Sequence, residues 1–122
     1  MLLVTYNKPM FTSAQRMNAT IHSTGFQVNH LYAFSIQAEY TGTPTGTLYL
    51  ECSCDPVPQG AVTNSPQPTN WTTVATSPIV VAAAGNYVWN CWAVGYTWVR
   101  LSYTDSSGGT STAMLTATFN GK

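Results

Sequence analysis

The stretch from Gly85 to Asn120 constrains the fold more than any other part of the chain. It contains three runs rich in β-branched and aromatic residues, separated by two glycine-bearing segments. Apolar side chains recur at every second position of these runs, which is the period of a β-strand. We therefore predict three consecutive antiparallel strands here, a β-meander, in an all-β protein.

The alternation assigns the side chains of these three runs to faces. Each run has one face with these side chains: Tyr87, Trp89 and Cys91 in the first run; Thr97, Val99, Leu101 and Tyr103 in the second; and Ala113, Leu115, Ala117 and Phe119 in the third. Trp98 and Arg100 share the opposite face of the second run. Three of the four tryptophans lie in this stretch, so we expect it to supply the largest share of the core.

A second pair of strands is predicted upstream. Leu31–Tyr40 alternates most clearly outside the meander, and Thr47–Cys54 alternates in the same way. The glycine- and proline-bearing segment Thr41–Gly46 joins them. We interpret the pair as a hairpin that carries Glu39 and Glu51 on its exposed face.

The remaining segments are shorter. Residues 1–12 fit an edge strand or an extended arm, because a proline ends any central pairing. One strand is predicted around residues 15–23, with a short helix at 12–18 as the competing interpretation. Two short strands follow at Trp71–Val74 and Ile79–Ala82.

A proline-rich loop separates the two halves. Residues 55–70 hold four of the seven prolines, which excludes a regular element. We expect this loop to form a surface or inter-subunit contact. With about seven or eight short strands and no convincing helix, residues 1–122 are predicted to form a single antiparallel β-sandwich domain, of jelly-roll or immunoglobulin-like kind.

The charge content narrows the functional classes. Only 7% of the 122 residues are charged, with four Lys+Arg and four Asp+Glu, against roughly 25% in an average soluble domain. Such a chain has no basic surface for nucleic acid and no polybasic segment for a membrane. Near-zero net charge suits a subunit that hides much of its surface in an assembly. The first four residues are too short for a signal-peptide core, so we expect synthesis in a cytoplasm.

The cysteines do not predict a disulfide framework or a metal site. Cys52 and Cys54 share one face of a strand, and Cys91 lies in the meander. Because the chain has three cysteines, one thiol stays unpaired even if the other two form a disulfide. The two histidines, His22 and His30, belong to another segment. We expect three reduced cysteines, no bound metal and no cofactor.

Catalytic groups are few. The carboxylates are Glu39, Glu51, Asp55 and Asp105, and no G-x-S-x-G sequence is present. Glu39 and Glu51 could form a glycosidase-like pair across the predicted hairpin, but two carboxylates on a wet strand face are usually just solvated. We therefore expect a protein that is not an enzyme.

Aromatic side chains are the better candidates for a functional surface. The candidates for a subunit interface or a ligand platform are Tyr49, Trp92, Tyr96, Trp98 and Arg100. Large rigid rings suit both interface cores and the stacking of sugars, and we favour the core or an interface. Arg100 is expected to pack on Trp98 or to pair with Asp105.

Residues 69–122 also resemble small β-sandwich virion proteins of tailed bacteriophages. The residues that carry this resemblance are Asn70–Trp71–Thr72, the turn Gly85–Asn86 with Trp89, the Gly95–Arg100 strand, the loop Ser106–Gly109, and a last strand that closes on Asn120–Gly121–Lys122.

The resemblance implies a head decoration, head-fibre or tail-associated subunit, and brings no catalytic residues with it. Together with the composition, it predicts a virion protein made in the host cytoplasm that forms homo-oligomers, a trimer by expectation, and docks on a major capsid or tail protein. The alternative is a carbohydrate-binding module for host attachment, with glycans as partners.

Overall fold

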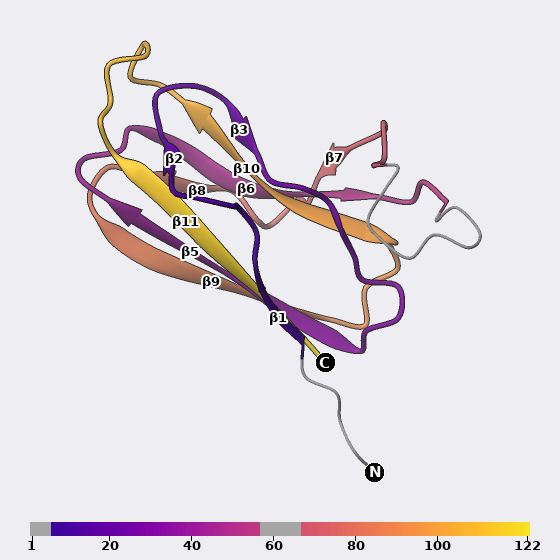
Figure 1. The fold of residues 1–122 in the computed structure, drawn as a ribbon. Helices are drawn as coiled ribbons and strands as arrows, with labels where there is room; N and C mark the ends of the chain where they lie inside the picture. The colour runs from indigo at the N-terminus through magenta and orange to yellow at the C-terminus, as the bar shows by residue number, and fades with distance from the viewer. Residues whose placement is uncertain (1–5, 57–66) are drawn as a thin grey trace.

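The computed structural model describes residues 6–56 and 67–122. They form a β-sandwich of two antiparallel sheets, which confirms the all-β prediction (Figure 1). Sheet A contains β1 (Tyr6–Pro9), β2 (Gln15–Arg16), β5 (Ala33–Thr41), β9 (Gly85–Trp92) and β11 (Met114–Gly121). Sheet B contains β3 (Ile21–His22), β4 (Phe26–Gln27), β6 (Gly46–Ser53), β7 (Thr72–Thr73), β8 (Ile79–Val81) and β10 (Trp98–Asp105). The described part of the chain contains no helix, and hence none able to span a membrane.

The strand order shows how the sheets are built. Sheet A runs β1-β11-β5-β9, and β2 also pairs with β11. Sheet B runs β3-β10-β6-β7, with β4 on β10 and β8 on β6. The described residues thus form eleven strands, more than the seven or eight expected, because several segments contain strands of only two or three residues.

The core lies between the sheets and follows the predicted alternation. The buried side chains of the long strands are Phe34, Ile36 and Ala38 of β5, Leu48 and Leu50 of β6, Val99, Leu101 and Tyr103 of β10, and Leu115, Ala117 and Phe119 of β11. Phe119 is stacked between two other rings, with centroids 4.8 Å from Phe26 and 5.6 Å from Phe34. The residues that the sequence grouped on one face of β10 and on one face of β11 therefore do face the core.

The predicted β-meander is wrong in its pairing. β9 and β11 both lie in sheet A, where β5 separates them, and β10 lies in sheet B. The predicted hairpin is wrong for the same reason, because β5 belongs to sheet A and β6 to sheet B. A strand with one apolar face alternates identically whether its connection turns back within one sheet or crosses to the other.

The crossing between β5 and β6 depends on close packing at its end. Pro44 is buried, and Gly42 adopts a φ of 74°, a region that glycine enters without steric cost. Gly46 begins β6 directly against Tyr103 and the backbone of β10. The segment therefore connects sheet A to sheet B across the edge of the core and does not form a tight hairpin turn within one sheet.

The N-terminal segment also crosses between the sheets. β1 is an edge strand on β11, paired from Tyr6 with Gly121 to Pro9 with Thr118. The single strand predicted around residues 15–23 is instead two short ones, β2 in sheet A and β3 in sheet B. Residues 1–5 of the predicted arm and 57–66 of the proline-rich loop lie outside the described residues.

Candidate functional site

The two described ends of the proline-rich loop are fastened to each other. The Asp55 carboxylate accepts hydrogen bonds from the backbone N–H groups of Thr69 at 2.9 Å and Asn70 at 3.1 Å. The Asn70 side-chain amide donates to the same carboxylate at 3.1 Å. These bonds, the side-chain one foremost, lower the pKa of Asp55. The two ends of the loop, Asp55 after β6 and Asn70 before β7, are therefore held next to each other beside sheet B.

The returning end of the loop covers part of the outer face of sheet B. Gln67 accepts a hydrogen bond from the Gly25 N–H at 2.6 Å, which ties the loop to the segment between β3 and β4. The Trp71 indole N–H donates to the Pro68 carbonyl at 3.1 Å. Trp98 donates its indole N–H to the Asp55 carbonyl at 3.0 Å and is 1% exposed. Trp98 is thus buried outside the main core.

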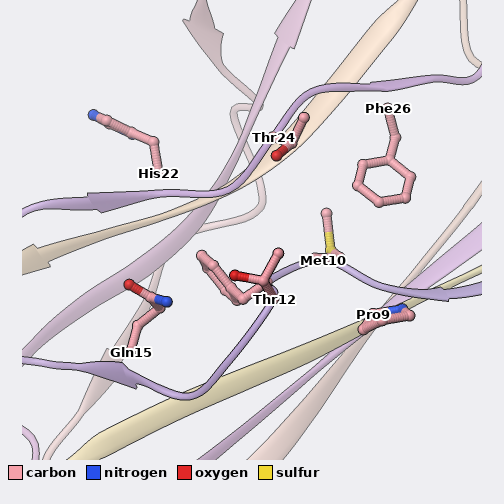
Figure 2. Close-up of a pocket in the computed structure, with 8 residues that line it drawn as sticks. Pro9, Met10, Thr12, Gln15, His22, Thr24 and Phe26 are labelled. Atoms are coloured by element: carbon pink, nitrogen blue, oxygen red, sulfur yellow. The ribbon is translucent and has the colours of Figure 1, made fainter. Parts of the chain in front are cut away.

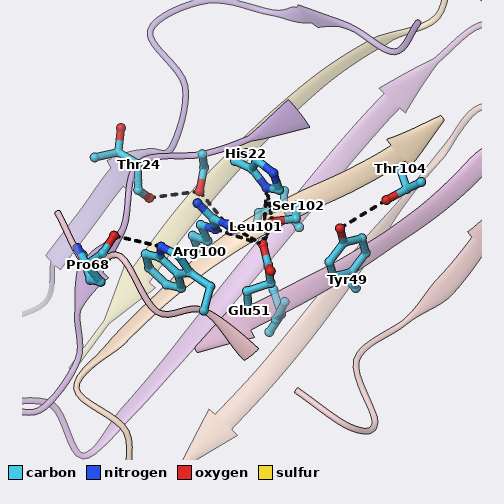
Figure 3. Close-up of polar contacts among 12 residues, drawn as sticks. His22, Thr24, Tyr49, Glu51, Pro68, Arg100, Leu101, Ser102 and Thr104 are labelled. Carbon is cyan, nitrogen blue, oxygen red and sulfur yellow. Dashed lines mark hydrogen bonds and ion pairs between the residues drawn. The ribbon is translucent and has the colours of Figure 1, made fainter. Parts of the chain in front are cut away.

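Beside Trp98 lies a polar group that we call the Glu51 cluster, made of His22, Glu51, Arg100 and Ser102 (Figure 3). Arg100 donates to Glu51 Oε1 at 2.9 Å, and the Ser102 hydroxyl donates to the same oxygen at 2.5 Å. His22 Nδ1 lies 2.8 Å from Ser102 Oγ and 3.3 Å from Glu51 Oε1. The Arg100 guanidinium also lies 4.3 Å from the ring centroid of Trp71.

The Glu51 cluster has the residue types of a hydrolytic triad but not its geometry. A nucleophilic serine needs a free imidazole nitrogen as the acceptor for its proton. Here the Ser102 hydroxyl donates to Glu51, and His22 meets both residues through the same nitrogen. Ser102 is also 1% exposed. The arrangement ties β3, β6 and β10 together and neutralises a largely buried guanidinium.

The cluster predicts a pH-dependent stability. Burial, and then the charge of Arg100, lower the pKa of His22 by more than Glu51 raises it. The unfolded chain, with the usual histidine pKa of 6.5, then binds a proton more readily than the folded chain. The stability contributed by neutral His22 is therefore present above pH 6.5 and is lost as the pH falls towards the lower folded pKa.

We expect the unfolding free energy from urea titrations to fall between about pH 7 and pH 5, and to fall less in His22→Gln. The control is His30→Gln, at an exposed histidine outside the cluster. A steeper decline in His22→Gln than in the unmodified protein contradicts the assignment.

The five residues chosen from the sequence do not form one surface. Tyr49, Trp98 and Arg100 share the outer face of sheet B, where the Tyr49 hydroxyl lies 3.1 Å from Thr104 Oγ1. Tyr96 is half-buried against the core, its ring centroid 6.4 Å from that of Phe34. Trp92 is 65% exposed at the end of β9 in sheet A.

Two expected contacts of Arg100 are not formed. Its partners are Glu51 and Trp71, whereas Asp105 accepts hydrogen bonds from Ser107 and Gly109 in its own loop. Neither partner is near Arg100 in sequence, so spacing along one strand could not indicate them.

The carboxylate pair considered for glycoside hydrolysis is separated by the whole sandwich. Glu39 lies on the outer face of β5 in sheet A, and Glu51 lies on the outer face of β6 in sheet B. Stacked sheets lie about 10 Å apart, and these side chains point away from each other. Paired glycosidase carboxyls lie at most about 9.5 Å apart. Glu39 and Glu51 therefore cannot act on one bond.

The three cysteines are free thiols. Burial raises the pKa of Cys91 and of its hydrogen-bonding neighbour Tyr96, and it also raises the pKa of Cys52. These groups are accordingly protonated at neutral pH. Within residues 6–56 and 67–122, no group of three His, Cys, Asp or Glu side chains could hold a metal ion.

A cleft of about 380 Å³ opens between the segment that follows β1 and the segment from β3 to β4 (Figure 2). Met10 and Phe26 give it an apolar floor, and Thr12, Gln15 and Thr24 give it a polar rim. His22 borders the cleft, but in Figure 2 its ring points away from Met10 and Phe26. No Asp, Glu, Lys or Arg lines it, so the cleft has no fixed charge to select a ligand.

Exposed apolar side chains gather along β9. Tyr87, Val88 and Trp92 are 41%, 43% and 65% exposed. Tyr32, which precedes β5 where Ala33 pairs with Trp92, is 76% exposed. Of these four residues, only Trp92 was among the candidates chosen from the sequence. Tyr32 falls within the predicted strand Leu31–Tyr40, but it lies before β5 begins at Ala33, so the alternation does not apply to it.

The comparisons with known proteins bear on the fold. No protein-family model matches the sequence, and no curated protein matches it either. Among solved structures, the chain is similar to the SPBc2 prophage-derived protein YomS, with a TM-score of 0.58 and 9% sequence identity. The match covers 99% of this chain and 96% of that chain. At this identity the similarity shows the fold alone, so the chain has, over nearly its whole length, the fold of a prophage-derived protein.

Proposed function

We propose that this protein is a non-enzymatic structural subunit of a bacteriophage particle, which self-associates and docks on a capsid or tail protein. The observation that carries the proposal is the match in fold to a prophage-derived protein over nearly the full length of both chains.

The surface supports the same function. The two described outer faces differ: loop ends and the Glu51 cluster cover part of sheet B, whereas the outer face of sheet A carries mainly hydroxyl and amide side chains with Glu39. Apolar side chains project along β9 at the edge of sheet A. A neutral polar face bordered by exposed aromatic residues resembles the composition of protein interfaces, where charged residues are depleted.

The proposal is tested by locating the protein in particles. Particles from cells that express the gene are separated by density-gradient centrifugation, and peptides of this chain are quantified against the major capsid protein. We expect the chain to co-sediment with particles at a fixed ratio that a salt wash does not change. Recovery only from the soluble fraction at the top of the gradient would overturn the proposal.

A carbohydrate-binding module remains the second candidate because of one observation. Trp92, at the end of β9, and Tyr32, just before β5, are both largely exposed, and Ala33 next to Tyr32 is the pairing partner of Trp92. Exposed aromatic rings can stack on sugars. A glycan array and tryptophan emission with added polysaccharide test this function. Binding that Trp92→Ala abolishes would favour it, and a silent array with unchanged emission would remove it.

A further inference from the structure

The backbone register shows which edge of the sandwich is open. Lys122 N–H donates to the Ala33 carbonyl at 2.9 Å and Ala33 N–H donates back at 3.4 Å, so Ala33 directs its backbone groups towards β11. Every second residue of β5 does the same, and the intervening residues face β9. The β9 partners of those intervening residues are Gly85, Tyr87, Trp89 and Cys91.

The other four residues of β9 therefore direct their N–H and C=O groups outwards. They are Asn86, Val88, Asn90 and Trp92. The bond from Ala93 N–H to the Tyr32 carbonyl, 3.0 Å, continues the same alternation. Among the described residues β9 pairs only with β5. Four N–H donors and four C=O acceptors thus lie along this edge without a backbone partner among residues 6–56 and 67–122.

β9 lacks the features that protect the other sheet edges of the described chain. The opposite edge of sheet A carries Lys8 and Pro9 on β1 and Arg16 on β2. The edges of sheet B are formed by strands of two or three residues. Charges, proline and short length are the usual means of preventing edge-to-edge pairing. β9 has eight residues, none of them charged and none proline.

We propose that β9 is a homodimer interface, at which it pairs antiparallel with β9 of a second copy and joins two A sheets into one. With Trp89 facing Trp89 of the other copy, Val88 pairs with Asn90 and Asn86 pairs with Trp92, so all four outward residues of each strand are used. Each of these pairs exchanges two backbone hydrogen bonds. Two observations favour a second copy as the partner. β9 carries no charged residue, so two copies of it can pair without charge repulsion. This two-fold register also gives a partner to the backbone N–H and C=O of all four outward residues.

This inference deepens the self-association in the proposed function. It replaces the trimer expected from the sequence by a two-fold dimer, because symmetric antiparallel pairing of one edge with itself closes at two copies. The pairing would also cover Tyr87 and Val88, which the isolated chain leaves exposed.

The first test compares Asn90→Pro with Asn90→Ala by sedimentation equilibrium. Proline removes the outward N–H of Asn90 without removing a bond to β5, and alanine keeps that N–H. We expect the unmodified protein and Asn90→Ala to reach twice the 13.2 kDa chain mass. In Asn90→Pro the dissociation constant should rise at least about tenfold.

The second test uses charge, in case proline disturbs folding. Val88→Lys places a charge on the open edge, and Gln37→Lys places the same charge on the neighbouring strand of the same face, opposite Val88. We expect only Val88→Lys to weaken the dimer. A dimer broken by Gln37→Lys and unaffected by Val88→Lys would place the interface on the sheet face and overturn the proposal.

Amide exchange gives a readout specific to strand pairing. The N–H groups of Asn86, Val88, Asn90 and Trp92 should become protected as protein concentration rises, whereas those of Tyr87 and Trp89 should be protected throughout. A monomer at every concentration, a mass of three chains, or protection that appears only when particles are added would each overturn self-pairing. A monomer that still co-sediments with particles would leave the proposed function standing.

Discussion

Gly46→Ala should destabilise the protein by about 3 kcal/mol or more. A β-carbon at this position would lie 2.2 Å from the Thr104 carbonyl oxygen and 2.5 Å from the Tyr103 hydroxyl oxygen. Thr104 cannot shift easily, because β10 is paired with β6 on one side and with β3 and β4 on the other. Tyr103 is fully buried in the core cluster, so any shift of its ring displaces its neighbours.

Gly95→Ala is the matched control. A β-carbon at Gly95 would have no neighbour within 4 Å, and its φ is not in the left-handed region. Restricting the unfolded chain should make this variant neutral or more stable by up to about 1 kcal/mol. Urea unfolding of both variants measures the difference. Equal free energies for the two would show that the contact at Gly46 does not constrain the crossing between β5 and β6.

Trp98→Ala should cost about 3 to 5 kcal/mol of unfolding free energy. The indole is 1% exposed and donates to the Asp55 carbonyl, so the change removes a large buried side chain and leaves an acceptor without its partner. It should also loosen the base of the proline-rich loop, because Asp55 holds the returning strand end through Thr69 and Asn70.

Trp92→Ala, at 65% exposure, should stay within about 0.5 kcal/mol of the unmodified protein. Chemical denaturation at a protein concentration low enough to avoid self-association compares the two tryptophans. If Trp98→Ala lowered the unfolding free energy as little as Trp92→Ala, Trp98 would lie on an accessible surface and would not be covered by Asp55 and the loop ends.

The faces of the long strands could be predicted from the sequence. In β10 and β11 the period of two separated Val99 and Leu101 from Arg100, and Leu115 from Thr116, as burial in the folded chain confirms. The prediction of faces succeeds because the alternation of apolar and polar residues within one strand is enough to indicate which side is buried.

Pairing partners could not be predicted in the same way. Alternation in β9 and β10 is equally consistent with a hairpin and with a crossing, so the sequence favoured the shorter connection. The bend at Gly46 depends on Tyr103, far along the chain, and no local signal records that contact.

The candidate site shows the same limit more strongly. Glu51, His22, Ser102 and Trp71 come from four separate segments and meet only when the strands of sheet B have paired. Trp98 was a candidate for the core, an interface or a ligand platform; it is buried, but beneath Asp55 and the loop ends, which the pattern of its own strand could not indicate. Tyr32 was included in the predicted strand Leu31–Tyr40, although β5 begins only at Ala33.

The position of β11 determines when this molecule can fold. β11 lies within sheet A and supplies the pairing partner of β1, β2 and one side of β5, yet all three of these strands lie far from it in the sequence. Until β11 pairs with them, these three strands have no neighbour on that side, and the folding chain leaves apolar strands open. Folding should therefore be slow, as for other proteins dominated by distant pairings, and loss of β11 should prevent assembly of the whole sandwich.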